Sequence, residues 1–239
     1  MSPRLQFVLV TLLSASLFLL GLALGQWQLG RAAQKQGIMD ERAKAFDQPV
    51  VLNADLSAQS ATPKLFYRKV RLQGSWLAEQ TYYLDNRKMG GKVGLIVVTP
   101  IRLEGQDRVV LVQRGWIPRN FLDRTQLVAV PTTPGLVEID GQITPWPSRL
   151  LDLGDSDAGP IRQNLEPSAF TGVQNWLSTD ISVQQMGPAP DGLRRDWVLP
   201  GAGVDTHYGY AFQWFTLSAL VAVYYLWFQI VKKYRRRKN

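Results

Sequence analysis

Residues Phe7 to Gly25 read F-V-L-V-T-L-L-S-A-S-L-F-L-L-G-L-A-L-G, a run without a charged side chain. A helix of about 20 apolar residues is long enough to cross the hydrocarbon core of a bilayer. The run therefore predicts a transmembrane helix, which we place at residues 7–27. A cleaved signal peptide is the alternative, because Ala23-Leu24-Gly25 resembles a weak cleavage site, although signal-peptide cores are usually about 7–15 residues long.

A second uncharged run lies near the C-terminus. No Asp, Glu, Lys or Arg occurs from Thr206 to Val231, and six of the eight residues after it are basic. Lys and Arg mark the cytoplasmic flank of a membrane span. We therefore predict a second transmembrane helix at residues 206–231, a cytoplasmic tail at 232–239 and a cytoplasmic N-terminus at 1–6, which contains Arg4. RNA or anionic-lipid binding is the alternative role for the basic tail.

Residues 28–205 then form a loop on the outer side of the membrane. Of the 27 Lys and Arg residues, 20 lie in this region with all 19 Asp and Glu residues, so its net charge is about +1. This balance argues against nucleic-acid binding. The loop is too long to be a linker, and we expect a folded periplasmic domain in a bacterial inner membrane protein. The intermembrane space of a mitochondrion is the other location that this orientation permits.

The outer domain begins with polar, helix-prone residues 31–48, which we expect to continue the first helix. The pattern then changes to alternating apolar and polar residues, typical of half-buried strands. Strands are predicted at Tyr67–Trp76, Thr81–Asn86, Val93–Ile101, Arg108–Trp116 and Leu136–Thr144, with an edge strand at Trp197–Leu199. Gly105 lies in the short loop of a hairpin formed by the third and fourth strands. Residues 145–160 predict a loop and Glu166–Ser178 a short helix.

The predicted fold class is a membrane protein in which two transmembrane α-helices flank a mainly β (α+β) extracytoplasmic domain. Antiparallel helices allow residues to be matched by depth, which puts Gly25 near Gly209 and Gly21 near Gln213. Gly21 and Gly25 form a G-x-x-x-G spacing that permits close backbone approach. The same matching puts Trp27 level with His207.

Few catalytic mechanisms are compatible with this composition. The chain has no cysteine and a single histidine, His207, which excludes thiol nucleophiles and zinc-thiolate sites. No G-x-S-x-G elbow is present to accompany a Ser-His-Asp triad. Asp152, Asp155 and Asp157 resemble a calcium loop only loosely, because the closing glutamate is missing. We therefore expect that the protein is not an enzyme; a membrane-tethered envelope enzyme is the competing hypothesis.

His207 lies at the start of the second span. A neutral imidazole can ligate haem iron, and the membrane boundary suits a macrocycle with an apolar ring and polar propionates. Arg31, Arg194 and Arg195 are cations that could pair with those propionates. The competing interpretation is an interfacial histidine hydrogen-bonded to Asp205 or to a backbone carbonyl.

Five separated motifs together resemble the Surfeit locus protein one family, assembly factors for cytochrome c oxidase. They are G-Q-W-Q-L-G-R-A-A-Q-K (Gly25–Lys35), F-Y-R-K-V-R-L-Q-G-S-W (Phe66–Trp76), L-D-N-R (Leu84–Arg87), V-Q-R-G-W-I-P (Val112–Pro118) and H-Y-G-Y-A-F-Q-W-F (His207–Phe215). They occur in order within the same two-span layout. Gly115 needs either a positive φ or close packing, and Trp76 and Trp116 are large enough to be core anchors.

The resemblance implies a non-enzymatic role in the maturation of haem-copper oxidase. Bacterial members are associated with transient binding of haem a, and the histidine of the last motif is a proposed iron ligand. The implied haem-binding residues are His207, Tyr210, Gln213, Trp214, Trp27, Arg31 and Arg114, with His207 bound to the metal. Arg114 is alternatively a buried partner of a carboxylate.

The implied partners are the catalytic subunit of cytochrome c oxidase, the haem a synthesis machinery and membrane lipid. In this interpretation the protein assists the insertion of haem a into the catalytic subunit. The alternative is a cofactor-free membrane scaffold that stabilises an oxidase subunit during assembly.

Overall fold

The computed structural model describes residues 2–56, 63–123, 125–151, 159–197 and 203–231. The chain divides into two compact units. The helix unit comprises residues 1–40 and 199–239, and the β unit comprises residues 41–198.

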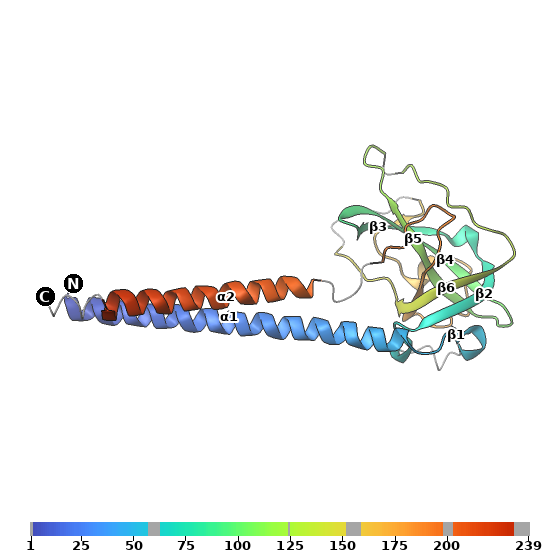
Figure 1. Cartoon of the computed structure of the whole chain (residues 1–239). Helices are drawn as coiled ribbons and strands as arrows, with labels where there is room; N and C mark the ends of the chain where they lie inside the picture. The colour runs from blue at the N-terminus through green and yellow to red at the C-terminus, as the bar shows by residue number, and fades with distance from the viewer. Residues whose placement is uncertain (1, 57–62, 124, 152–158, 198–202, 232–239) are drawn as a thin grey trace. The chain divides into compact units, whose positions relative to one another are not determined.

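Two long helices make up the helix unit (Figure 1). α1 spans Pro3–Phe46, and its last turns, from Glu41, belong to the β unit. α2 spans Val204–Tyr225 and continues as the π-helix η5, Leu226–Val231. Both α1 and α2 are long and apolar enough to cross a membrane by length and composition. The prediction that residues 31–48 prolong the first helix is confirmed as far as Phe46.

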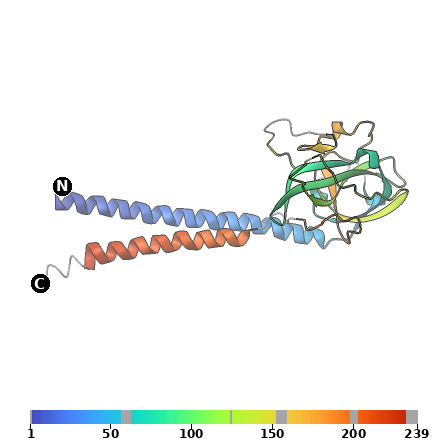
Figure 2. The same cartoon turned by 90° about the horizontal axis from the view of Figure 1, so that it is seen from above.

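α2 runs antiparallel to α1, and the two lie side by side in both views (Figures 1 and 2). The residues through which the two helices touch form a line along each helix, which we call the contact line, and this line contains small residues. An added Cβ at Gly21 would lie 2.1 Å from Ser218 Oγ, and one at Gly25 would lie 2.5 Å from the Phe215 ring. Ser218 Oγ also donates a hydrogen bond to Phe18 O at 3.3 Å. The G-x-x-x-G spacing therefore does mark the face along which the helix backbones approach.

The predicted depth matching is wrong in detail. Gly25 does not meet Gly209, which has no atom within 4 Å of its Cβ position. Gly21 lies against Trp214 O and Ser218 rather than against Gln213. Matching by depth gives the level of a residue but not the side of the helix on which it lies, and Gly209 lies on the side turned away from α1.

The register of the helix pair can be tested by cross-linking, because the chain has no native cysteine. The Cβ position at Gly21 is 3.4 Å from Ser218 Cβ, close to the separation of disulfide-bonded Cβ atoms, about 3.5–4.5 Å. The double variant Gly21→Cys with Ser218→Cys should therefore form a disulfide under mild oxidation, detected as linked fragments after proteolysis of the intervening region. Gly30→Cys with Ser218→Cys is the control. Equal cross-linking in the two variants would contradict the register.

The described strands of the β unit form one eight-stranded sheet. Its long strands are β2 (Lys69–Trp76), β3 (Tyr82–Met89), β4 (Lys92–Leu103), β5 (Val109–Pro118) and β6 (Leu136–Pro145). The short strands are β1 (Val51–Leu52), β7 (Ile161–Arg162) and β8 (Ile181–Gln185). Short 3-10 turns also occur at Asn53–Asp55, Pro63–Leu65, Ala78–Gln80 and Pro167–Ala169. The prediction of a mainly β domain between the two helices is thus confirmed.

Five of these strands close into a ring. The sheet order runs β2-β6-β8-β5-β4, and the end of β4 pairs back to β2 through Ser75↔Arg102 and its neighbours. β4 pairs with β3 along its first part and with β2 only at its end. β4, predicted from the sequence at Val93–Ile101, is therefore the strand that bends from the open sheet into the ring. A closed ring leaves few exposed strand edges.

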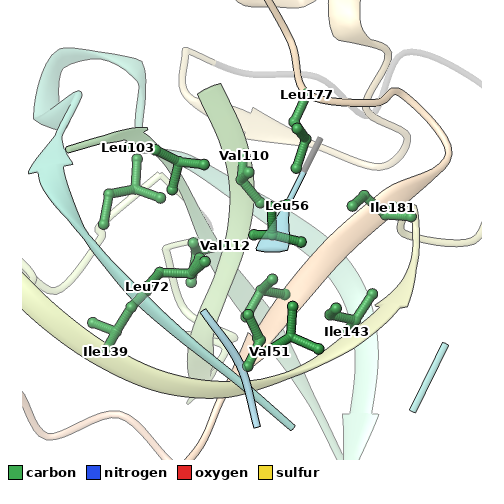
Figure 3. Close-up of a cluster of buried hydrophobic side chains, with 13 residues drawn as sticks. Val51, Leu56, Leu72, Leu103, Val110, Val112, Ile139, Ile143, Leu177 and Ile181 are labelled. Atoms are coloured by element: carbon green, nitrogen blue, oxygen red, sulfur yellow. The ribbon is translucent and has the colours of Figure 1, made fainter. Parts of the chain in front are cut away.

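Buried aliphatic side chains fill the interior of this ring (Figure 3). Fully burying such a side chain contributes about 1.5–3 kcal/mol. Each ring strand supplies two members: Val70 and Leu72 from β2, Ile101 and Leu103 from β4, Val110 and Val112 from β5, Ile139 and Ile143 from β6, and Ile181 and Val183 from β8. Alternate residues of each strand thus point inward, as the period of two requires.

The sequence analysis missed β8, whose pairing with both β5 and β6 closes the ring. It also missed the two-residue strands β1 and β7. The helix predicted at Glu166–Ser178 is wrong, since this segment contains only the 3-10 turn Pro167–Ala169 and Phe170 and Trp176 point into an aromatic cluster. Trp197 is not in a strand, and the rest of the predicted edge strand lies outside the described residues.

Closure of the ring requires Gly74. A Cβ at this position would lie 2.2 Å from Arg102 O, a backbone atom of β4. Gly74→Ala should therefore push β2 from β4 and destabilise the β unit by about 3 kcal/mol, at the upper end of ordinary overpacking. The urea midpoint of the purified full chain measures this effect. Ser75→Ala, at the exposed neighbouring position, should change stability by less than about 0.5 kcal/mol, and similar losses for both variants would count against the closure.

Candidate functional site

The first candidate site surrounds His207 in the helix unit. α2 begins after Gly203, whose φ of 87° turns the chain into the helix. His207 is half-buried and lies one turn before the buried residue Ala211. Ala211 and Ser218 are the buried residues of α2, so His207 stands on the stripe of α2 that faces α1.

His207 is held by a side chain of α1. Its Nδ1 lies 2.7 Å from Gln28 Oε1. Because an amide oxygen can only accept, Nδ1 carries the hydrogen in this bond. The lone pair of the neutral imidazole is then on Nε2, to which no described residue bonds. The competing interpretation paired His207 with Asp205 or with a backbone carbonyl, whereas in the structure its partner is the side chain of Gln28. A metal-binding histidine is typically oriented by such a bond from its other nitrogen.

The other predicted residues of the helix unit can be placed by helical geometry. Tyr210 precedes Ala211 of the contact line, and Arg31 precedes the buried Ala32 in the same way. Successive residues turn by about 100°, and two antiparallel helices are related by an approximate two-fold axis across their contact. In both helices, the residue that comes immediately before a contact-line residue in the sequence therefore lies on the same side of the helix pair. Trp27, which precedes Gln28, is on this side too.

These residues form an exposed aromatic flank, which we define as Trp27, Arg31, Tyr210 and Gln213. Trp27 is 57% exposed and Tyr210 is 49% exposed. Gln213 lies one turn beyond Tyr210 and further from the contact line, and Trp214 is half-buried beside it. Arg31 donates to Gln34 at 3.1 Å at this exposed position. The six predicted residues of the helix unit, His207 and Trp214 included, thus lie on or next to one flank.

Arg114, the remaining predicted residue, belongs to the β unit. It is the extra residue of a β-bulge, since Gln113 and Gly115 pair with adjacent β4 residues and Arg114 pairs with none. Bulges re-aim side chains. The Arg114 side chain is 4% exposed and lies 3.8 Å from Asp191. It also donates to Thr132 Oγ1 at 2.8 Å and to Pro131 O at 2.7 Å, so of the two predicted alternatives the structure has the buried partner of a carboxylate.

The carboxylate of Asp191 pairs with two guanidinium groups, those of Arg114 and Arg195. Arg195 Nη2 donates to Asp191 Oδ2 at 2.6 Å, and Arg195 Nε donates to the carbonyl oxygen of Arg114 at 2.8 Å. Burial lowers the pKa of both Arg114 and Arg195, and the Asp191 carboxylate opposes this in each case. Arginine remains charged at neutral pH. The cluster of Arg114, Asp191 and Arg195 therefore carries one positive charge in excess.

Two of the sequence motifs pack against each other in the β unit. Trp116, which is 1% exposed, donates from Nε1 to Arg87 O at 2.9 Å. Arg119 lies 3.4 Å from Asp85. Asn86 adopts a φ of 58° in a bulge of β3 between Leu84 and Arg87. The contact between the two motifs, L-D-N-R and V-Q-R-G-W-I-P, therefore has a structural role. Trp116 is the core anchor predicted from its size.

Gly115 is explained by close packing rather than by a positive φ. A Cβ there would lie 2.6 Å from Leu193 Cβ. Trp76 is only partly buried, and its ring stacks under the Arg114 guanidinium at 4.9 Å. Arg194 lies over the Trp116 ring and pairs with Asp196 at 2.7 Å.

Sequence reasoning missed Asp191 and the orienting role of Gln28. Asp191 stands in an irregular D-G-L-R-R segment, and no local pattern links it to Arg114. Gln28 was in a recognised motif, but its partner lies 179 residues away. Among the described residues no group of three His, Cys, Asp or Glu could hold a metal ion. The cluster of Asp152, Asp155 and Asp157 lies outside the described residues.

These features define a class of protein with two long apolar helices, one histidine oriented by a side chain of the other helix, and a closed β domain. The family model that matches is the SURF1 family, over residues 15–219. The chain belongs to the SURF1 family.

Individual relatives agree with this assignment. The chain is 25% identical over 238 residues to a SURF1-like protein of Rickettsia prowazekii, covering 91% of this chain and 88% of the relative. It is 26% identical over 236 residues to Surfeit locus protein 1 of Homo sapiens, covering 86% and 72%. It is 31% identical over 99 residues to the cytochrome oxidase assembly protein SHY1 of Saccharomyces cerevisiae, covering 39% and 24%.

The buried charge cluster can be tested by removing its carboxylate. Asp191→Asn leaves two buried guanidiniums without a counter-charge, and breaking a buried pair in this way costs about 3–5 kcal/mol. Chemical unfolding of the full chain measures the loss. Asp196→Asn is the matched control, since the pair that Asp196 makes with Arg194 is exposed and such pairs contribute about 0–1 kcal/mol. If Asp191→Asn were no worse than Asp196→Asn, the cluster would not be a buried structural element.

Proposed function

We propose that this chain assists the assembly of cytochrome oxidase and transiently holds haem a against the aromatic flank, with His207 Nε2 as the iron ligand. The observation that carries the proposal is the bond from His207 Nδ1 to Gln28, because it leaves the lone pair of the imidazole on Nε2. The role in oxidase assembly is inferred from the yeast relative, which is named cytochrome oxidase assembly protein SHY1.

The residues of the helix unit suit an amphiphilic macrocycle. Exposed Trp27 and Tyr210 offer flat apolar faces next to the imidazole. Arg31 lies one turn beyond Trp27 on the same flank and is a cation for a propionate. Haem a is here a cargo, and the protein residues bind and orient it. In this proposal Gln28 holds the imidazole in one tautomer, and the fixed ring orientation aids reversible binding.

We further propose that α1 and α2 span the bacterial inner membrane with both termini in the cytoplasm and the β unit in the periplasm. Support comes from the length and apolar character of the two helices. The orientation is supported by the basic residues that follow Val231 in the sequence. His207 would then lie at the outer boundary, where haem could be passed to the catalytic subunit of the oxidase. Arg114 as a propionate contact remains a prediction.

A cofactor-free scaffold is the second candidate function. The loop after β5 displays Phe121, which is 78% exposed, and Leu122, which is 100% exposed. Asn120 Oδ1 accepts hydrogen bonds from the backbone of Leu122 and Asp123, which orders this turn. Exposed apolar side chains on an ordered turn favour contact with a partner, and such contact needs no haem.

The test is the absorption spectrum of the chain expressed together with haem a synthesis and purified in detergent. We expect bound haem a in the wild type and none in His207→Ala. Gln28→Ala should lower haem affinity about 10-fold or more, because loss of a residue that orients a ligand typically costs 10–100-fold. Gln26→Ala, which changes the same residue type at an exposed position of α1, is the control.

Two outcomes would contradict the haem-binding proposal. One is a His207→Ala variant with the wild-type spectrum and haem content. The other is co-purification of the oxidase subunit with no haem under any loading condition, which would favour the scaffold.

A further inference from the structure

The β unit contains a pocket of its own, and Arg114 is the one lining residue that is also among the predicted haem-binding residues. Its volume is about 500 Å³. Apolar side chains form much of the wall, among them Trp76, Val137, Met186 and Pro188. The cluster of Arg114, Asp191 and Arg195 forms its charged side. Polar and apolar groups thus contribute about equally to the wall. Polar groups that converge beside apolar side chains are a usual feature of small-molecule sites.

The charge inside this pocket favours an anion. Arg114 and Arg195, with side chains 4% and 5% exposed, share the single carboxylate of Asp191. Glu138 and Asp140 also line the pocket. These two carboxylates are at least half exposed, and both already pair with Arg71. Because the single charge of Arg71 cannot neutralise both carboxylates, the exposed rim keeps one negative charge in excess. The buried side keeps one positive charge in excess, and an anion would bind there.

Two polar atoms of the pocket lining have no hydrogen-bond partner among the described residues. They are Arg114 Nε, a donor, and Gln185 Oε1, an acceptor, and both are buried. Buried polar atoms are hydrogen-bonded in the large majority of cases. A guanidinium N–H on a side chain that is 4% exposed lacks the acceptor that a bound anion would supply.

We propose that this pocket binds a small carboxylate with an apolar body. The carboxylate lies against Arg114 and Arg195, and the body lies against Trp76 and the proline-rich wall. Carboxylate is the anion that matches one excess charge and the planar donors of a guanidinium. Linear fatty acids and flat ring systems that carry a carboxylate share this chemistry. The inference goes beyond the proposed function, because it concerns the β unit alone and its test uses no haem.

The experiment is calorimetric titration of the full chain in lipid nanodiscs with four probes. Octanoate represents the linear carboxylates and 2-naphthoate the flat ones, and octanamide and 2-naphthamide are their neutral counterparts. We expect at least one carboxylate to bind 10-fold or more tightly than its own amide. The carboxylate with the larger preference identifies the shape of the natural ligand.

Two variants locate the binding. Thr133 is exposed and lines the pocket, so Thr133→Trp should fill the pocket and lower affinity at least 10-fold without touching the charge cluster. Thr171→Trp places the same bulk at an exposed residue outside the pocket lining and should bind like the wild type. Arg195→Gln removes the excess charge and should abolish the preference for the carboxylate over the amide.

Equal binding of each carboxylate and its amide would overturn the proposal, as would the absence of binding by all four probes. Unchanged affinity in Thr133→Trp would also overturn it, because the ligand would then lie elsewhere. Circular dichroism of each variant checks that the β unit is folded, so loss of binding is assigned to the pocket only in folded protein.

Discussion

The contact line between α1 and α2 determines where the functional groups of the helix unit lie. Glycines at positions 21 and 25 let the backbones approach until Ser218 bonds to a carbonyl oxygen of α1. Once these residues are in contact, the antiparallel register places His207 beside Gln28. The same register places the residues that immediately precede contact-line residues in the sequence on one side of the helix pair. A shift of one residue in either helix would rotate His207 away from its partner.

The β unit has a different constraint, which is closure of its ring around an aliphatic core. Closure makes the strands bend, and the bulge at Arg114 in β5 is part of that bending. The bulge in β5 also places an arginine inside the protein, where desolvation is costly. Asp191, from a loop far along the chain, supplies the carboxylate that makes that burial tolerable, and it also pairs with Arg195. The charged side of the pocket is thus a consequence of how the ring closes.

Family membership and the physical features of this chain support the functional proposal in different ways. Membership rests on a family match to residues 15–219 and carries no residue-level chemistry by itself. The tautomer of His207 rests on one hydrogen bond and is a statement about this chain alone. The two are independent, because the bond to Gln28 would favour Nε2 as a ligand in any protein. The orientation of this histidine is therefore the reason for proposing His207, among the residues of the chain, as the iron ligand.

Much of the fold could be predicted because it depends on local patterns. The two uncharged runs, the period-two strands and the hairpin at Gly105 all match elements of the structure. Predictions failed where distant contacts override local preference. β8 is a strand because β5 and β6 both offer free edges to it. The segment after Glu166 is irregular because Phe170 and Trp176 join an aromatic cluster instead of forming a helix.

The candidate site, like the fold, could be predicted from the sequence only in part. The sequence alone determined that one histidine stands at the start of an uncharged helix, because composition and hydropathy are local properties. Only the tertiary structure decided which nitrogen of that histidine is available, because the deciding partner, Gln28, lies 179 residues earlier in the chain. Likewise, only the tertiary structure decided that Arg114 is buried against Asp191, because the charge of an arginine is visible in the sequence but its burial depends on strands that meet only in the folded protein.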